Sequence, residues 1–190
     1  MRRTGAHPRL NRGRALAGLL CAFALSAAVC MAAPQAEYRV KAVFLFNFAQ
    51  FVEWPPETFR GPEEPFVIGI LGSDPFGPDL DAVVQGETVG QRRMTVERYR
   101  SVAELRNCNI LYIGRNEIEH LPQILAALKG RSILTVSDAD EADQSGVMIR
   151  LLNQRSHIRM QIDVSAAKRG NLTISSKLLR PAEIVSTGEG

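Results

Sequence analysis

The sequence contains little cysteine, tryptophan or histidine: three, one and three residues, respectively, among 190. Beyond residue 33 only Cys108 remains, and a chain with one thiol forms no internal disulfide. Cys108 begins a strand-like run, which favours a buried, inert thiol; an intermolecular disulfide is the alternative. His120 and His157 lack a metal ligand at helical or turn spacing, so no metal site is predicted.

Motifs for catalysis and for cofactor binding are also missing. Gly69, Gly72 and Gly77 follow an apolar run, but their spacing matches neither a dinucleotide fingerprint nor a P-loop. The segment 138–143 is acidic, yet Ala142 interrupts an EF-hand pattern, and we interpret the segment as a solvated acidic cap. Ser176 and Lys177 are adjacent and therefore point in different directions. We predict no enzyme and no cofactor.

No apolar run is long enough to be a clear membrane span. The longest, residues 15–30, has about 16 residues where a span needs roughly 20. Five arginines precede or open it, and Ala32 and Ala33 follow. This order predicts a signal peptide over residues 1–33 and an exported mature protein; an uncleaved anchor is the alternative.

The basic character of the chain belongs to this leader. The whole sequence carries a net charge of +3. Without the five leader arginines the remainder has 18 basic and 20 acidic residues, a net charge of −2. The charge therefore gives no support for nucleic-acid binding.

The stretch 37–54 contains four of the eight phenylalanines and the only tryptophan. Its apolar residues have helical spacing, and charges interrupt it, so it predicts an amphipathic helix packed on a core and not a membrane span. Pro55 ends the helix. We expect a buried stripe formed by Val40, Val43, Phe44, Phe48, Phe51 and Val52, with Lys41 outside it. Phe46 and Trp54 are candidate dimer contacts.

Buried strands alternate with helical segments through the middle of the chain. Residues 66–71, 109–113 and 131–136 are apolar runs, and helices are expected between them, with Asp74 capping the first. This order predicts an α/β fold with three layers, a mostly parallel sheet flanked by helices. It also predicts one domain over residues 35–185 and a flexible tail over 186–190.

Two strands at residues 146–152 and 156–164 predict an antiparallel hairpin at one edge of the sheet. Apolar and polar residues alternate along the second strand, which places Arg159, Gln161 and Asp163 on its solvent-exposed (wet) face. Residues 172–180 close the domain.

The chain resembles the YfiR family of periplasmic proteins. The resemblance rests on residues 37–55, 68–77, 108–113, 158–164 and 174–180, which cover nearly the whole mature chain in order. It implies a regulator that binds the periplasmic domain of a membrane-bound diguanylate cyclase, holds it inactive and restrains biofilm formation, and that can form a homodimer. Family members can carry two disulfides; here Leu71 stands near one expected partner of Cys108, so redox control by internal disulfides is not expected.

A polar surface formed by the C-terminal part of the sequence is the candidate partner site. It combines the wet face of the alternating strand with the closing segment: Arg159, Gln161, Asp163, Ser176, Lys177 and Arg180. A periplasmic small-molecule-binding module is the alternative function. Its ligand would bind at the Gly72–Pro75 turn, which follows a buried strand.

Overall fold

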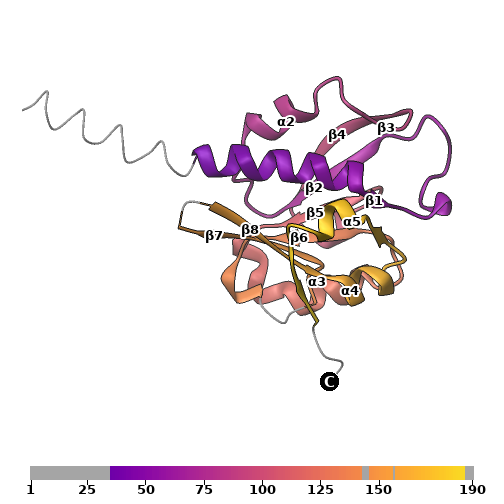
Figure 1. The fold of residues 1–190 in the computed structure, drawn as a ribbon. Coiled ribbons are helices and arrows are strands. Elements are labelled where there is room, and N and C mark those ends of the chain that lie inside the picture. The colour runs from indigo at the N-terminus through magenta and orange to yellow at the C-terminus, as the bar shows by residue number, and fades with distance from the viewer. Residues whose placement is uncertain (1–34, 143–145, 156, 187–190) are drawn as a thin grey trace, which may run out of the picture. The chain divides into compact units, whose positions relative to one another are not determined.

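A computed structural model describes residues 35–142, 146–155 and 157–186. The predicted signal peptide lies outside these residues, as does most of the predicted tail. The described residues from Glu37 onward form one compact unit (Figure 1). None of the described helices is long and apolar enough to cross a membrane.

An eight-stranded sheet organises this unit, with the order β10-β8-β7-β6-β5-β2-β4-β3. Neighbours from β4 to β7 are parallel, while β8 is antiparallel to β7 and β3 is antiparallel to β4. The predicted mostly parallel sheet and its antiparallel hairpin are therefore confirmed. The strands are β2 (Phe66–Leu71), β3 (Thr88–Val89), β4 (Arg92–Tyr99), β5 (Ile110–Ile113), β6 (Leu134–Ser137), β7 (Ile149–Gln154), β8 (His157–Asp163) and β10 (Glu183–Val185).

Short strands and helices complete the unit. β1 (Val52–Glu53) pairs with β9 (Thr173–Ile174), a two-residue ladder that the sequence did not reveal. Residues 35–51 are helical. The remaining α-helices are α2 (Pro78–Val84), α3 (Leu121–Leu128), α4 (Val164–Arg169) and α5 (Ser176–Leu179), and the 3-10 turns are Pro56–Thr58, Val102–Glu104, Arg115–His120 and Asp140–Ala142.

The two faces of the sheet are covered by different helices. Ile70, Ile110 and Tyr112 point to the face that packs against the helix 35–51 and α2, whereas Leu71 and Leu111 point to the face covered by α3. Strand alternation sends these neighbours to opposite sides, which explains why β2 is buried along its whole length. The result is the predicted three-layer arrangement (Figure 1).

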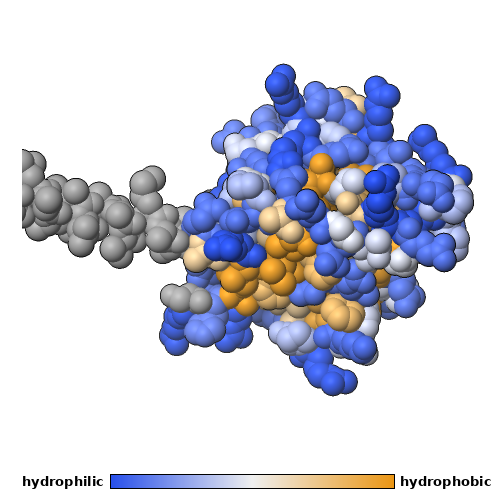
Figure 2. Space-filling view, turned by 90° about the horizontal axis from the view of Figure 1, so that it is seen from above, coloured by the Kyte–Doolittle hydropathy of each residue, from blue (hydrophilic) through white to orange (hydrophobic). Residues whose placement is uncertain are grey.

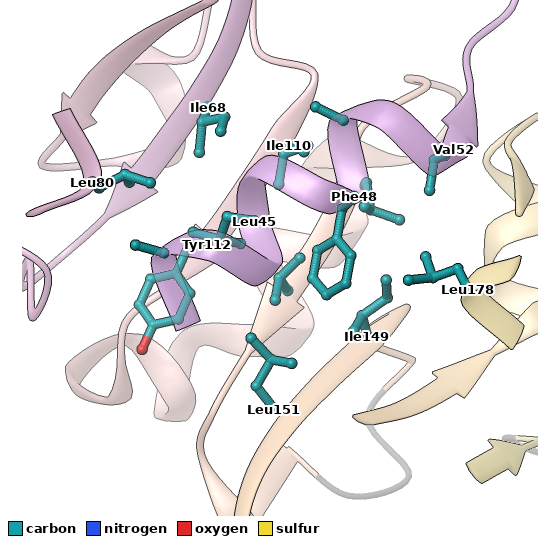
Figure 3. Packing of buried hydrophobic residues seen from close by; sticks show 14 of the residues in the cluster. Leu45, Phe48, Val52, Ile68, Leu80, Ile110, Tyr112, Ile149, Leu151 and Leu178 are labelled. Atoms are coloured by element: carbon teal, nitrogen blue, oxygen red, sulfur yellow. The ribbon is translucent and has the colours of Figure 1, made fainter. Parts of the chain in front are cut away.

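The helix 35–51 supplies much of the main core. Leu45 and Phe48 of this helix, and Val52 of β1 directly after it, lie over strands β5 and β7 and over α5 (Figure 3). Phe48 is fully buried, and burying such a side chain contributes about 1.5–3 kcal/mol.

The predicted buried stripe of this helix is partly wrong. Val40 and Val43 are 48% and 45% exposed, while Lys41 is fully buried. Figure 2, which views the molecule from above, shows a region of the surface where apolar side chains gather. The helix is rotated about its axis relative to the prediction, because Lys41 faces acidic partners in the core. The apolar spacing alone had predicted that the valines would be buried.

The turn before α2 also differs from the prediction. The helix begins at Pro78, and its N-cap is Gly77 with a φ of 53°, a backbone conformation that favours glycine. Asp74 instead closes a local turn, since its Oδ1 accepts hydrogen bonds from the amides of Phe76 (2.7 Å) and Gly77 (3.2 Å).

Candidate functional site

The predicted partner residues fall into two groups on different faces of the sheet. Gln161 lies on the α3 face, where its Oε1 accepts a hydrogen bond from Arg150 at 2.8 Å. Lys177 lies on the opposite face, with its Nζ 5.9 Å from the centre of the Phe51 ring. Arg159 belongs with Gln161 by strand alternation. The exposed Ser176 precedes Lys177 on α5, and the exposed Arg180 directly follows this helix. The structure therefore does not unite the six residues in one patch.

Asp163 is a correction. We predicted a solvent-exposed side chain, but it is 1% exposed. Its Oδ1 accepts a hydrogen bond from the Ala166 amide at 2.8 Å and thereby caps α4. This cap satisfies a helix-terminal donor, so Asp163 supports the fold.

The sheet edge beside Arg159 is partly open. β10 pairs with residues 161–163 of β8, and in the described part of the chain no strand pairs with residues 157–160 on that side. A hollow of about 540 Å³ next to them is lined by Gln154, Arg155, His157 and Arg159. Among the described residues, this lining is basic and polar and contains no carboxylate. Ile184 of β10 is 53% exposed on the same edge.

A buried ion cluster on the other face was missed at the sequence level. It centres on Asp138, which directly follows β6 and is 1% exposed, so the predicted solvated acidic cap is wrong at this position. Lys41 lies 2.5 Å from Asp138 Oδ2 and also pairs with Glu37. Tyr38 donates to the same oxygen at 2.9 Å.

The second carboxylate oxygen of Asp138 is equally occupied. Tyr112 donates to Oδ1 at 2.7 Å, and Arg115 Nε donates to it at 3.2 Å. Four side chains thus fill the roughly four acceptor positions of one carboxylate. Asp138 therefore has no acceptor position left for a metal or a substrate, and it joins the helix 35–51 to the carboxyl ends of β5 and β6.

Titration in this cluster follows from its contacts. Burial alone raises the pKa of Asp138, but the bonds from Lys41, Tyr112 and Arg115 outweigh it, and the net pKa lies below its ordinary value. Burial, together with the Asp138 charge, raises the pKa of Tyr38 to about 12. Burial and the Asp138 charge also raise the pKa of Tyr112. Asp138 is therefore ionised and both tyrosines are protonated at neutral pH, the states in which these hydrogen bonds form.

A sequence signal for this cluster existed. Lys41 stands one turn after Glu37 inside an apolar stretch, and Asp138 follows a buried strand. Side chains that follow parallel strands meet at one edge of the sheet, and a helix packed there brings its lysine to them. Helical periodicity could not identify the pair, because 97 positions separate its members.

Cys108, Phe46 and Trp54 occupy partly or fully buried positions. Cys108 is a free, buried thiol whose Sγ donates to the Ile110 carbonyl at 3.0 Å, and burial raises its pKa to about 12. Trp54 packs edge-on against Phe66 with ring centres 4.8 Å apart, and its Nε1 donates to the Asn109 carbonyl at 3.3 Å. Phe46 packs partly against the main core. A dimer contact and an intermolecular disulfide at these residues stay predictions.

The Gly72–Pro75 turn is closed by neighbouring side chains. A Cβ at Gly72 would lie 2.6 Å from Asn116 Oδ1, and that oxygen accepts a hydrogen bond from the Ser73 amide at 2.8 Å. Asp74 Oδ2 binds Arg98 Nε at 2.7 Å. The Ser73 amide and the Asp74 carboxylate, which a ligand at this turn would meet, are thus engaged. Across the described residues, no three His, Cys, Asp or Glu side chains are grouped to hold a metal ion.

Comparison with known families decides the relationship of the chain. The profile of the YfiR/HmsC-like family matches residues 38–183, from the first helix to β10. The chain belongs to this family. This YfiR/HmsC-like chain is therefore a periplasmic regulator in general class, in a family known for regulation rather than catalysis. Comparison with curated proteins gives no match.

Proposed function

We propose that the protein binds the periplasmic domain of an inner-membrane diguanylate cyclase and holds the cyclase inactive. Less cyclic di-GMP is then made, and biofilm formation is restrained. The observation that carries this proposal is membership of the YfiR/HmsC-like family over residues 38–183.

Such repression needs no chemistry by this protein. It needs a higher affinity for the inactive conformation of the cyclase than for the active one. A preference of about 5.5 kcal/mol moves a two-state partner from 1:99 to 99:1. A single protein interface of ordinary size can supply this difference.

The open half of β8 is the surface that we assign to the partner. An extended partner segment could pair with the backbone of residues 157–160, as strands do when they add to a sheet edge. Arg155, His157 and Arg159 give this edge a basic rim, so the segment that docks here is expected to be acidic. Gln161, bonded through its Nε2 to Glu183 at 3.1 Å, continues the surface onto β10.

Arg159→Glu tests this surface. We expect the affinity for the purified periplasmic domain of the cyclase to fall about tenfold or more, because one charge-assisted contact becomes a repulsive one. Binding is measured by calorimetry at two salt concentrations, since the contribution of an exposed charge is screened by salt. Arg93→Glu, at an exposed position of β4 near the other edge of the sheet, is the matched control.

Two outcomes separate the surface from the function. Wild-type affinity in Arg159→Glu contradicts docking on the open half of β8, and Lys177→Glu then tests the α5 group. Failure of the wild-type protein to bind any cyclase domain encoded beside it contradicts the proposed function itself.

A further inference from the structure

A cleft of about 600 Å³ lies between α3 and α4 on the face of the sheet opposite the helix 35–51. The two helices lie side by side in Figure 1 and both contribute side chains to the cleft. Its volume falls within the roughly 300–1,000 Å³ of pockets that hold small ligands. The cleft contains none of the residues assigned above to the partner surface.

The walls of the cleft are mainly apolar. Leu125 and Leu128 come from α3, Ala166 from α4, and Ile133 and Met148 from the segments that precede β6 and β7. Burial of an apolar ligand against them would be favourable at about 25 cal/mol per Å² of apolar surface removed from water.

The charged side chains described at the cleft all have one sign. Lys129, Arg131 and Arg169 line it, and no aspartate or glutamate is among the described residues that do so. The Arg131 guanidinium already donates to the carbonyls of Leu105 (3.3 Å) and Arg106 (3.0 Å). Lys129 and Arg169, which are both exposed, are therefore the candidates for binding the charged group of a ligand. A second pocket, of about 300 Å³, differs because Glu57 and Glu64 accompany its arginines.

Gly170 keeps one wall adjustable. Its φ of −85° is open to any residue, so the backbone does not require glycine. A Cβ there would lie 2.7 Å from the Met148 Cε, so the missing side chain leaves room for that methyl group. The flexible methionine side chain can therefore change position and adapt the cleft to its occupant.

We propose that the α3–α4 cleft binds an amphiphilic monoanion: a compact apolar body in the cleft and a carboxylate at Lys129 and Arg169. The apolar walls bind the body, and the two cations select the charge. This site is independent of cyclase binding and adds a small-ligand input to the same domain.

Three probes of equal chain length test the proposal: decanoate, decan-1-ol and decylammonium. Calorimetry on the purified protein should give the tightest binding for decanoate, weaker binding for the alcohol and none for the cation. In methyl spectra, decanoate should shift the Met148 signal and leave that of Met94, which does not line the cleft, unchanged.

Variants isolate the role of charge. The double variant Lys129→Glu and Arg169→Glu should bind decanoate about tenfold less tightly or worse, as expected when a charged hydrogen bond is lost. Its binding of the alcohol should not change. Lys168→Glu, an exposed neighbour on α4 that does not line the cleft, should behave as wild type.

Equal binding of decanoate and decylammonium would overturn the proposal. So would wild-type decanoate affinity in the double variant, or an unshifted Met148 signal at saturating decanoate. The Met148 measurement uses the wild-type protein and does not depend on the folding of any variant.

Discussion

Lys41 and Asp138 show how one residue pair can set the orientation of a helix. Both side chains are inaccessible to solvent, and each ion is surrounded by groups that compensate for lost hydration. A buried pair need not add net stability, but removal of one member leaves an uncompensated charge.

Lys41→Met should therefore lower the free energy of unfolding by about 3–5 kcal/mol. Arg39→Met removes a cation from the same helix and is the matched control. Arg39 pairs with Asp79 at 3.6 Å and its side chain is 71% exposed, so that change should cost only about 0–1 kcal/mol. Urea unfolding of the two variants provides the comparison. Equal costs would contradict the importance of the buried pair.

At the scale of the element, the helix 35–51 was predicted correctly in type and in approximate extent. Its buried face was predicted wrongly. The valines at helical spacing were expected to be buried and the lysine beside them exposed, and the structure has the reverse. Hydrophobicity alone cannot anticipate an acidic partner that enters from a strand end far along the chain. The open half of β8 was likewise predicted only in part. Alternation predicted a strand with one solvent-exposed face, but it did not predict that β10 pairs with half of that strand.

The helix gives a direct test of its rotation. Val43→Thr should change the free energy of unfolding by no more than about 0.5 kcal/mol, because Val43 is 45% exposed. Leu45→Ala should cost about 2–5 kcal/mol, because it leaves a cavity over β5 and β7. Thermal or urea unfolding distinguishes them. If Val43→Thr lowered the free energy of unfolding more than Leu45→Ala does, that result would support the buried apolar stripe expected from the sequence.

For the whole molecule, the sequence was sufficient to predict a parallel sheet between helices, because buried strands and amphipathic segments alternate along the chain. The ion cluster and the α3–α4 cleft could not be predicted in this way. Each is assembled from residues that meet only after the strands are ordered, such as Tyr38 with Tyr112 around Asp138, or Leu125 with Ala166.

Acid should destabilise the whole domain through this cluster. The folded-state pKa of Asp138 is below its ordinary value of 3.8, and that of Glu37 is below 4.5. The unfolded chain therefore binds these protons first, so this stability is present above the ordinary pKa values and is lost as pH falls through the lowered ones.

We expect the free energy of unfolding to decrease from about pH 5 downward. In Asp138→Asn this decrease should be shallower, whatever the starting stability, whereas Asp140→Asn, at an exposed neighbouring position, should retain it. Urea unfolding at a series of pH values measures the slope. Identical slopes in the wild type and Asp138→Asn would contradict the role of this carboxylate.

The helix 35–51 has a further consequence for the order of folding during synthesis. It is made before the other described elements, yet its lysine meets a carboxylate 97 residues later, and Glu37 bonds to Asn153, 116 residues away. Val52 pairs with Ile174. Until those segments have been synthesised, the helix lacks its partners and its apolar face stays accessible to chaperones. Contacts of such high sequence separation slow folding. A nascent chain that stops before residue 138 also lacks the carboxylate that pairs with Lys41, so it cannot complete this domain.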